Sequence, residues 1–264
     1  MAAAVIEHGR VGPHDLLLEL GAGTGAVGGQ LAARHERYLG LDVSRPMLAT
    51  FAQRLARPIA AERRARSLRP LLVQADCDQH WPVLDGAATV VFASRVVHLL
   101  EPRHVAHEAA RVCRPGGHLL VGRVVRDPSS PRERLRREKQ RRLAERGLEP
   151  RRGDAGIRRL LEACMARGAE ALAPRVVATW TSRIAAERIL LGWAALPGMG
   201  GIPIAPAVQT AILDELWAWA RRELGDLRRP APCDERYVLE GVRFGRAGDP
   251  RRPITMNSAW TMLC

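Results

Sequence analysis

Short apolar runs alternate with helical patterns along the first 125 residues of this 264-residue chain. The runs are mostly apolar, the first broken only by Glu19, while the segments between them place their apolar residues three or four positions apart. Strands that are apolar on both faces and separated by helices indicate a parallel sheet covered on both sides. We therefore predict strands at residues 16–20, 38–41, 71–75, 88–93 and 118–124, and helices at residues 25–34, 44–55 and 102–113.

The pattern changes after residue 125, where a turn-rich break precedes a densely charged segment at residues 132–146. Beyond it, short strand patterns enclose longer helical ones, and a Gly/Pro-rich loop at residues 196–206 joins the last two helices. Strands are predicted at residues 176–180 and 237–244, and helices at residues 157–166, 182–193 and 207–227. Five parallel strands and a late strand pair indicate one domain with a helical insertion.

A glycine-rich loop follows the first predicted strand and opens the next helix. Gly21, Gly23 and Gly25 allow a tight turn and close approach of a ligand, and a helix beginning near Gly25 would direct free N–H groups at that ligand. With Ala26, the spacing also fits the G-x-G-x-x-G/A fingerprint of NAD-binding enzymes. Glu19 instead favours a ligand with an ammonium group, because its carboxylate would repel a pyrophosphate.

Acidic residues follow the second and third predicted strands. Asp42 lies 21 residues after Gly21, where an acid accepts hydrogen bonds from ribose hydroxyls in nucleotide-binding folds. Its alternative role is a helix N-cap, which Ser44 already offers. Asp76 directly follows the third strand and could accept a hydrogen bond from an adenine amino group, whereas Asp78 fits a cap or a solvated loop.

Together these motifs resemble the class I S-adenosylmethionine-dependent methyltransferases, most closely the ubiquinone/menaquinone-biosynthesis-like group (methyltransferase type 11) that acts on small molecules. The resemblance covers residues 10–125 and includes Asp85-Gly86 before the fourth strand and Pro115-Gly116-Gly117 before the fifth. It implies an α/β, Rossmann-like, doubly wound sheet that is mostly parallel, with a late antiparallel strand at residues 237–244 and a helical insertion near the C-terminus. Residues 1–264 would form a single domain, with a cofactor-binding core at 1–125 and substrate-side helices plus the last two strands at 126–264.

The resemblance also implies roles for individual residues. Glu19 and residues 21–25 would hold the methionine part of S-adenosylmethionine, Asp42 its ribose, and Met47 would pack on the adenine. Asp76 and the Cys77 amide would read the adenine edge. The residues predicted to bind the cofactor are Glu19, Gly21, Ala22, Gly23, Gly25, Asp42, Val43, Met47, Asp76, Cys77 and Ser94.

The acceptor is expected at the carboxyl ends of the fourth and fifth strands, where ligands bind in open α/β sheets. Arg95 could hold an acidic acceptor, and Arg123 and Asp127 lie at the same edge. His98 could act as a general base for an acceptor that must lose a proton, or it could have a structural role at a helix start. Trp193, in the helical insertion, could line a substrate lid or serve only in packing.

The chain carries a formal charge of +13, and Lys139 is its only lysine. Such an arginine skew is typical of a GC-rich genome and weakens the inference of a dedicated nucleic-acid or membrane surface. Residues 132–152 could contact RNA phosphates, but they include acids and lack the interleaved aromatics that stack on bases. A small-molecule acceptor is therefore favoured, with an RNA methyltransferase, an NAD-dependent oxidoreductase and a non-catalytic cofactor-binding protein as the alternatives.

Other sequence features narrow the class of protein. Five scattered cysteines without a C-x-x-C pair indicate neither disulfides nor a zinc site, and His104, His107 and Glu108 fit a solvated helix face better than a metal site, so no metal is expected. No secretory signal or membrane span is apparent, which predicts a cytoplasmic protein. Only about fifteen residues precede the first strand, so we expect a more open cofactor site or a missing leading segment. The sequence indicates neither the oligomeric state nor the acceptor.

Overall fold

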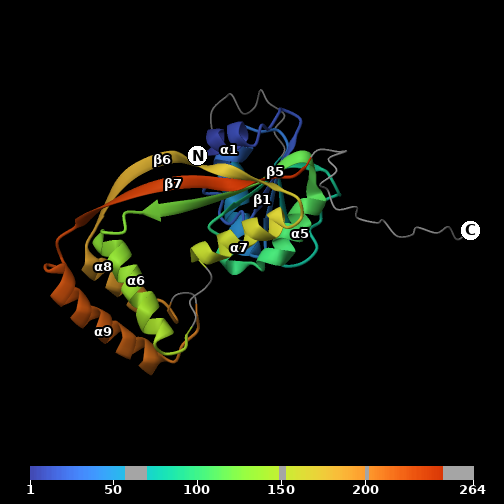
Figure 1. Ribbon diagram of the computed structural model, residues 1–264. Helices are drawn as coiled ribbons and strands as arrows, with labels where there is room; N and C mark the ends of the chain where they lie inside the picture. The colour runs from blue at the N-terminus through green and yellow to red at the C-terminus, as the bar shows by residue number, and fades with distance from the viewer. Residues whose placement is uncertain (57–69, 149–152, 200–201, 246–264) are drawn as a thin grey trace, which may run out of the picture.

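A seven-stranded sheet forms the centre of the computed structural model, which describes residues 1–56, 70–148, 153–199 and 202–245. The strand order is β3-β2-β1-β4-β5-β7-β6 (Figure 1). The strands are β1 (Leu16–Leu20), β2 (Tyr38–Asp42), β3 (Leu71–Gln74), β4 (Ala88–Ser94), β5 (Cys113–Arg126), β6 (Glu170–Ile184) and β7 (Ala231–Arg243).

The strand directions confirm the predicted fold class. The first five strands are parallel, and β7 lies antiparallel between β5 and β6. The chain order reverses between β1 and β4, so the loops at their carboxyl ends diverge and leave a crevice of the kind in which open α/β sheets bind ligands. The sheet therefore places the glycine-rich loop after β1 at this crevice.

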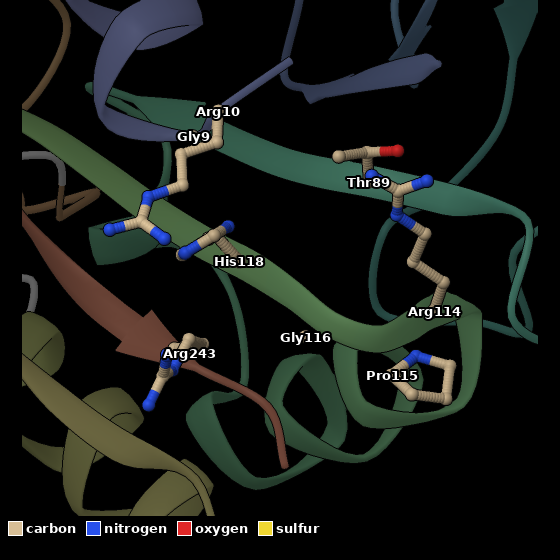
Figure 2. A pocket seen from close by; sticks show the side chains of 8 residues that line it. All are labelled: Gly9, Arg10, Thr89, Arg114, Pro115, Gly116, His118 and Arg243. Carbon is tan, nitrogen blue, oxygen red and sulfur yellow. The ribbon is translucent and has the colours of Figure 1, made fainter. Parts of the chain in front are cut away.

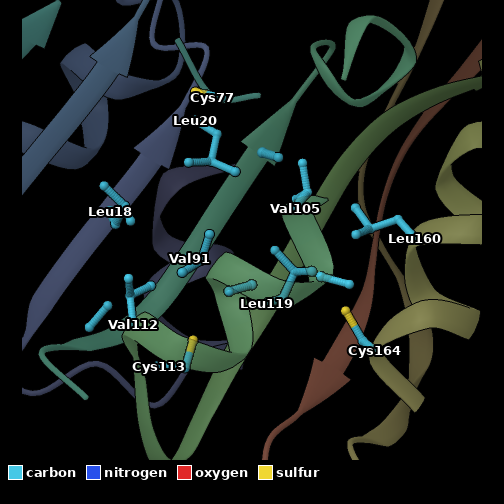
Figure 3. Packing of buried hydrophobic residues seen from close by; sticks show 14 of the residues in the cluster. Leu18, Leu20, Cys77, Val91, Val105, Val112, Cys113, Leu119, Leu160 and Cys164 are labelled. Atoms are coloured by element: carbon cyan, nitrogen blue, oxygen red, sulfur yellow. The ribbon is translucent and has the colours of Figure 1, made fainter. Parts of the chain in front are cut away.

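Helices cover both faces of the parallel strands. On one face, α1 (Ala2–His8), α2 (Gly28–Ala32) and α3 (Arg45–Ala56) pack on a cluster that includes Leu17 and Phe92. On the other face, α5 (Pro102–Val112), α7 (Gly153–Met165) and the short 3₁₀ helix η1 (Val97–Leu99) pack on a cluster that includes Leu18 and Leu119 (Figure 3). Successive side chains of β1 thus enter opposite cores, as expected for a strand buried on both faces.

Three remaining helices form a separate group at the far ends of the long strands β5, β7 and β6 (Figure 1). These are α6 (Pro131–Ala144), α8 (Ala186–Ala194) and α9 (Pro206–Leu224), which share a cluster that includes Leu135, Leu190 and Leu216. Within the described residues, no helix has both the length and the apolar character that crossing a bilayer requires.

Several predicted boundaries are wrong, and the structure gives a physical reason for each. The helix predicted at residues 25–34 extends only over Gly28–Ala32, because Gly25 has a φ of +77° that a helix cannot accommodate. Residues 182–184, predicted as helix, continue β6 because they pair with residues 231–233 of β7. The predicted turn at residues 115–117 lies inside β5, where it forms an irregularity in the pairing with β4, with Gly116 at a φ of +81°.

Arg111 of α5 anchors the segment that leads into β4. It donates hydrogen bonds to both carboxylate oxygens of Glu108, to the carbonyls of Trp81 and Val83, and to Asp85. Burial alone would raise the pKa of Glu108, but hydrogen bonds from Arg111 and from the Trp81 amide bring it down to about 2. Glu108 is 2% exposed, so Arg111 is the charge that allows this carboxylate to remain ionised inside the protein.

Replacing Arg111 with methionine should lower the free energy of unfolding by about 3–5 kcal/mol, because Glu108 would remain buried without its charge partner. The free energy of unfolding should fall clearly less in the double variant Glu108→Gln/Arg111→Met, since no unpaired buried charge remains. Denaturant unfolding followed by circular dichroism measures both. Equal losses in the two variants would show that the charge pairing is not what stabilises this segment.

Candidate cofactor and acceptor site

The loop after β1 is held between the ends of β2 and β4. The Ala22 amide donates to the carbonyl of Leu41 at 2.9 Å. Gly21 and Gly25 have φ values of +62° and +77°, and an added Cβ would lie 2.5 Å from a Val96 methyl carbon at Gly21 and 2.2 Å from the Phe51 ring at Gly25. These two glycines are therefore required by packing inside the protein, as well as by the turn itself.

Gly23 differs from its two neighbours. A Cβ at this position would meet no atom closer than 3.8 Å, and the atoms at 4.0 Å are the Asp42 carboxylate and the Met47 sulfur. There is thus room beside the Gly23 backbone, in a space next to an acidic and an apolar side chain where an added Cβ would make only ordinary van der Waals contacts. This is the geometry that lets a ligand approach a loop backbone closely.

Asp42 sits at the end of β2, beside that space. One carboxylate oxygen accepts a hydrogen bond from the Gly23 amide and the other from the Ser44 amide, both at 2.8 Å. A carboxylate has about four acceptor positions, so Asp42 can accept further hydrogen bonds from a ligand. Val43 and Met47 are 65% and 48% exposed, and they provide apolar surface next to the carboxylate.

The acids after β3 have different surroundings. Asp76 is exposed at the same edge of the sheet, with one oxygen accepting the Asp78 amide at 2.9 Å. Asp78 accepts a hydrogen bond from the Glu101 amide at 2.7 Å, directly before α5. Cys77 is buried, and burial raises the pKa of its thiol to about 11. A neutral thiol has no charge to offer a ligand, so a contact from this residue would come from its backbone.

Glu19 lies beneath the loop and is 3% exposed. Its carboxyl group accepts a hydrogen bond from the Tyr38 hydroxyl and lies where a side chain at Gly28 would have to fit. Burial, which outweighs the Tyr38 hydrogen bond, raises the pKa of Glu19 to about 8, and the nearby Asp42 adds to this effect. Glu19 is therefore mostly protonated at neutral pH, and it would ionise more readily when a cation lies nearby.

Tyr237 of β7 joins the site, although the sequence analysis did not select it. Its hydroxyl lies 2.6 Å from the Ser94 hydroxyl at the end of β4, and it occupies the space above Gly122, where an added Cβ would come within 2.0 Å. The side chain is 3% exposed, and burial raises its pKa. Only the register of β7 against β5 brings these residues together, and a single sequence does not reveal that register.

A cavity of about 530 Å³ opens at the carboxyl ends of β4 and β5. It brings together Arg95, His98 and Arg123, three residues predicted to lie near the acceptor. Arg126 and Arg132 add two more guanidinium groups to its wall. Apolar residues complete the lining together with Gly122, namely Val97, Val121, Val124 and Ile157.

Acidic side chains neutralise this cavity only in part. Glu240 pairs with Arg123 at 2.5 Å, while Glu235 pairs with Arg132 at 3.1 Å and with Arg126 at 3.4 Å. Arg95 is exposed and has a φ of +60°, a left-handed conformation that is uncommon outside glycine and asparagine. Four arginines against two glutamates give the cavity a positive potential.

Two other predicted residues lie outside this cavity. Asp127 accepts hydrogen bonds from the amide and hydroxyl of Ser129, which shape the turn before α6. Trp193 packs in the helical group, with the Lys139 ammonium 4.2 Å from its ring centroid. The structure thus places Trp193, partly buried, against the core of α6, α8 and α9, and its predicted contact with a substrate stays a prediction.

His104 and Glu108 are engaged in other contacts. The His104 ring contacts the Gln79 carbonyl at 2.8 Å, and Glu108 is bound to Arg111. Within the part of the chain that the structure describes, no group of three or more His, Cys, Asp or Glu side chains could hold a metal ion.

Part of this chain is similar in sequence to known proteins. Residues 18–121 match the family model described as a methyltransferase domain. A ubiquinone biosynthesis O-methyltransferase from Alkalilimnicola ehrlichii is 28% identical over 115 residues, which cover 43% of this chain and 43% of that protein. The match therefore spans less than half of the relative's length.

Solved structures share the fold over most of the chain. A Bacillus halodurans protein provisionally called a methyltransferase has a TM-score of 0.60 at 14% identity, covering 92% of this chain and 98% of that one. Geranyl diphosphate C-methyltransferase from Streptomyces coelicolor, solved with Mg²⁺, geranyl diphosphate and S-adenosylhomocysteine, has a TM-score of 0.50 at 15% identity, covering 92% and 77%. At these identities the likeness establishes the fold.

The raised pKa of Glu19 makes the stability of the protein depend on pH. Because the folded-state pKa lies above the ordinary value of 4.5, folding becomes less favourable as pH rises from about 5 through 8. Glu19→Gln keeps an acceptor for Tyr38 and removes this ionisation. We expect the wild type to lose at least about 1 kcal/mol relative to the variant between pH 5 and pH 8, measured by denaturant unfolding. If the difference in free energy of unfolding between the wild type and Glu19→Gln stayed constant from pH 5 to pH 8, the raised pKa of Glu19 would be contradicted.

Proposed function

We propose that this chain transfers a methyl group from S-adenosylmethionine to a small-molecule acceptor, since residues 18–121 match the family model described as a methyltransferase domain. The observation that carries the proposal is the space beside Gly23, bounded by the Asp42 carboxylate and the Met47 side chain. An accessible backbone, a carboxylate and an apolar side chain lie together here, and such a set can bind the sugar hydroxyls and the base of a nucleoside.

The residues around this space fit the adenosine part of the cofactor. Asp42 would accept hydrogen bonds from the ribose hydroxyls with its remaining acceptor positions. Val43 and Met47 would cover the adenine ring, since both expose apolar surface beside Asp42. Asp76, exposed at the same edge, would accept a hydrogen bond from the adenine amino group.

Glu19 would respond to the charge of the cofactor. Its carboxyl group is kept mostly neutral by burial, and a sulfonium or ammonium group nearby would favour its ionised form. The negative charge would then lie beneath the loop and would attract the cation without exposure to water. Cofactor binding would consequently release a fraction of a proton near neutral pH.

When bound, the cofactor supplies a methyl group that is already activated toward a nucleophile, so the protein has mainly to align the acceptor and exclude water. The cavity of about 530 Å³ would receive the acceptor, because it adjoins Ser94 and Gly122 at the same edge of the sheet. Arg95 and Arg123 would orient an acceptor that carries an acidic group. His98 would accept the proton that a hydroxyl acceptor loses.

The structure weakens the oxidoreductase alternative. A dinucleotide pyrophosphate is usually held at the N-terminus of the helix that follows the glycine-rich loop. Here that helix, α2, contains five residues and begins at Gly28, three residues after the last glycine of the loop. No comparable feature of the described residues favours RNA as the acceptor.

Calorimetric titration should give micromolar binding of S-adenosylmethionine and S-adenosylhomocysteine. Asp42→Ala should weaken that binding at least ten-fold, because the ribose loses its acceptor and the Gly23 amide loses its partner. Asp214→Asn, at an exposed position of α9, is the matched control and should bind as the wild type does. Binding of NAD alone would overturn the proposal. Cofactor binding without turnover on any acceptor would indicate that the chain is a non-catalytic cofactor-binding protein.

Acceptor chemistry is tested with acidic and neutral molecules of similar shape, such as 3,4-dihydroxybenzoate and 3,4-dihydroxybenzyl alcohol. We expect the acid to be methylated at least ten-fold more efficiently. Arg95→Asn should remove most of this preference by raising KM, because asparagine tolerates the left-handed backbone but carries no charge. The affinity for S-adenosylhomocysteine should not change. Equal rates for acid and alcohol in the wild type would exclude charge-based selection by the cavity.

A further inference from the structure

A second cavity, of about 290 Å³, lies at the opposite end of the parallel strands (Figure 2). It is formed around Thr89 and His118, near the amino ends of β4 and of the regular part of β5. The proposed cofactor and acceptor positions lie at the carboxyl ends of the same strands. This cavity is therefore separate from the site described above, and the proposed function does not use it.

Three guanidinium groups reach this cavity from three different parts of the chain. Arg10 follows α1, Arg114 belongs to the first residues of β5, and Arg243 ends β7. None of the described residues that line the cavity is acidic. In Figure 2 the Arg10 side chain reaches toward His118, and Arg114 lies beside Thr89 on the other side of the opening.

Acidic partners outside the lining reduce this charge without removing it. Arg114 pairs with Asp15 at 2.8 Å, and Arg243 pairs with Glu170. Each guanidinium carries five N–H donors, so both arginines retain donors after these contacts. No ion pair of Arg10 occurs among the described residues, and its side chain is exposed at the cavity.

The imidazole of His118 adds a second, independent observation. The residue is 5% exposed, yet its Nδ1 atom has no hydrogen-bond partner among the described residues. The neighbouring His8 has a buried Nε2 atom in the same condition. Buried polar atoms are almost always hydrogen-bonded, and leaving one without a partner is costly. Because His118 lines the cavity, its unpartnered Nδ1 atom indicates that a ligand completes its hydrogen bonds.

The electrostatics show what kind of ligand this would be. Burial lowers the pKa of His118 to about 4, and the positive charges of His8, Arg10, Arg243 and Arg114 contribute to the shift. Like charges are thus held close together without an acid inside the cavity. An anion at the centre would relieve their repulsion and accept hydrogen bonds from the imidazole and the guanidinium groups at once.

We propose that this cavity binds a phosphate-type oxyanion, as free inorganic phosphate or as the phosphate group of a small metabolite. Guanidinium groups match phosphate oxygens in geometry and charge. Donors that arrive from three separate elements also suit a tetrahedral anion better than a planar carboxylate. A bound anion would tie the end of α1 to β5 and β7, and it would stabilise the folded chain as any ligand of the native state does.

The proposal is tested by NMR titration of the histidine ring signals with inorganic phosphate, glycerol 3-phosphate and acetate at pH 7 and constant ionic strength. His118→Asn identifies the His118 signals. We expect saturable shifts of these signals with inorganic phosphate, glycerol 3-phosphate or both, at millimolar or lower concentration, and at least ten-fold weaker binding of acetate. Stronger binding of glycerol 3-phosphate would identify a phosphorylated metabolite as the ligand. Stronger binding of inorganic phosphate would identify the free ion as the ligand.

Arg10→Asn should weaken phosphate binding at least ten-fold, because asparagine accepts the φ of +49° at this position but removes the charge. Arg103→Gln, at an exposed position of α5, makes the same charge change elsewhere and should have no effect. Arg114→Gln is the second variant if Arg10→Asn does not fold, as judged by circular dichroism.

Phosphate should also raise the melting temperature of the wild type more than that of Arg10→Asn. Absence of saturation, equal binding of acetate, or equal weakening by Arg103→Gln would overturn the proposal.

Discussion

The Asp42 carboxylate connects three segments of the chain by accepting one backbone hydrogen bond from the glycine loop and another from the residue before α3. A loop with three glycines in left-handed conformations has few side chains with which to fix itself. Its position is therefore set from outside, by Asp42, by the Leu41 carbonyl and by the contacts of Val96 and Phe51 with its glycines. These contacts place Gly23 beside the Asp42 carboxylate and the Met47 side chain.

A pair of hydroxyl groups adds a side-chain contact to the β5–β7 ladder that joins the two halves of the sheet. Ser94 ends a strand of the parallel half, and Tyr237 belongs to β7, the antiparallel strand that returns from the helical group. Gly122 leaves room for the tyrosine ring between them. Strand β7 thus contributes the buried Tyr237 side chain to this edge of the sheet, while helices α6, α8 and α9 lie at the far ends of the long strands.

The sequence predicted β1 to β4 well because each of these strands is short, mostly apolar and bounded by a turn signal. The predictions for Asp42 and the glycine loop rested on local spacing, and the structure places these residues together. Prediction was weaker where long-range contacts decide the outcome. Residues 182–184 follow β7 instead of their local helical pattern, and Tyr237 reaches Ser94 across 143 residues. Glu19 was identified from its position, but its neutral state depends on burial that no sequence pattern reveals.

The strand β6 is last in the order of the sheet, so one of its sides faces no further strand among the described residues. Open edges of this kind promote aggregation because another chain can add a strand to them. Pro174 lies within β6 and cannot donate a backbone hydrogen bond, and the pairing with β7 shifts between Leu172 and Arg175. This interruption divides a 15-residue strand into shorter stretches that a second molecule could not extend in continuous register. The long strands that support the helical group are thus protected against growth into an intermolecular sheet.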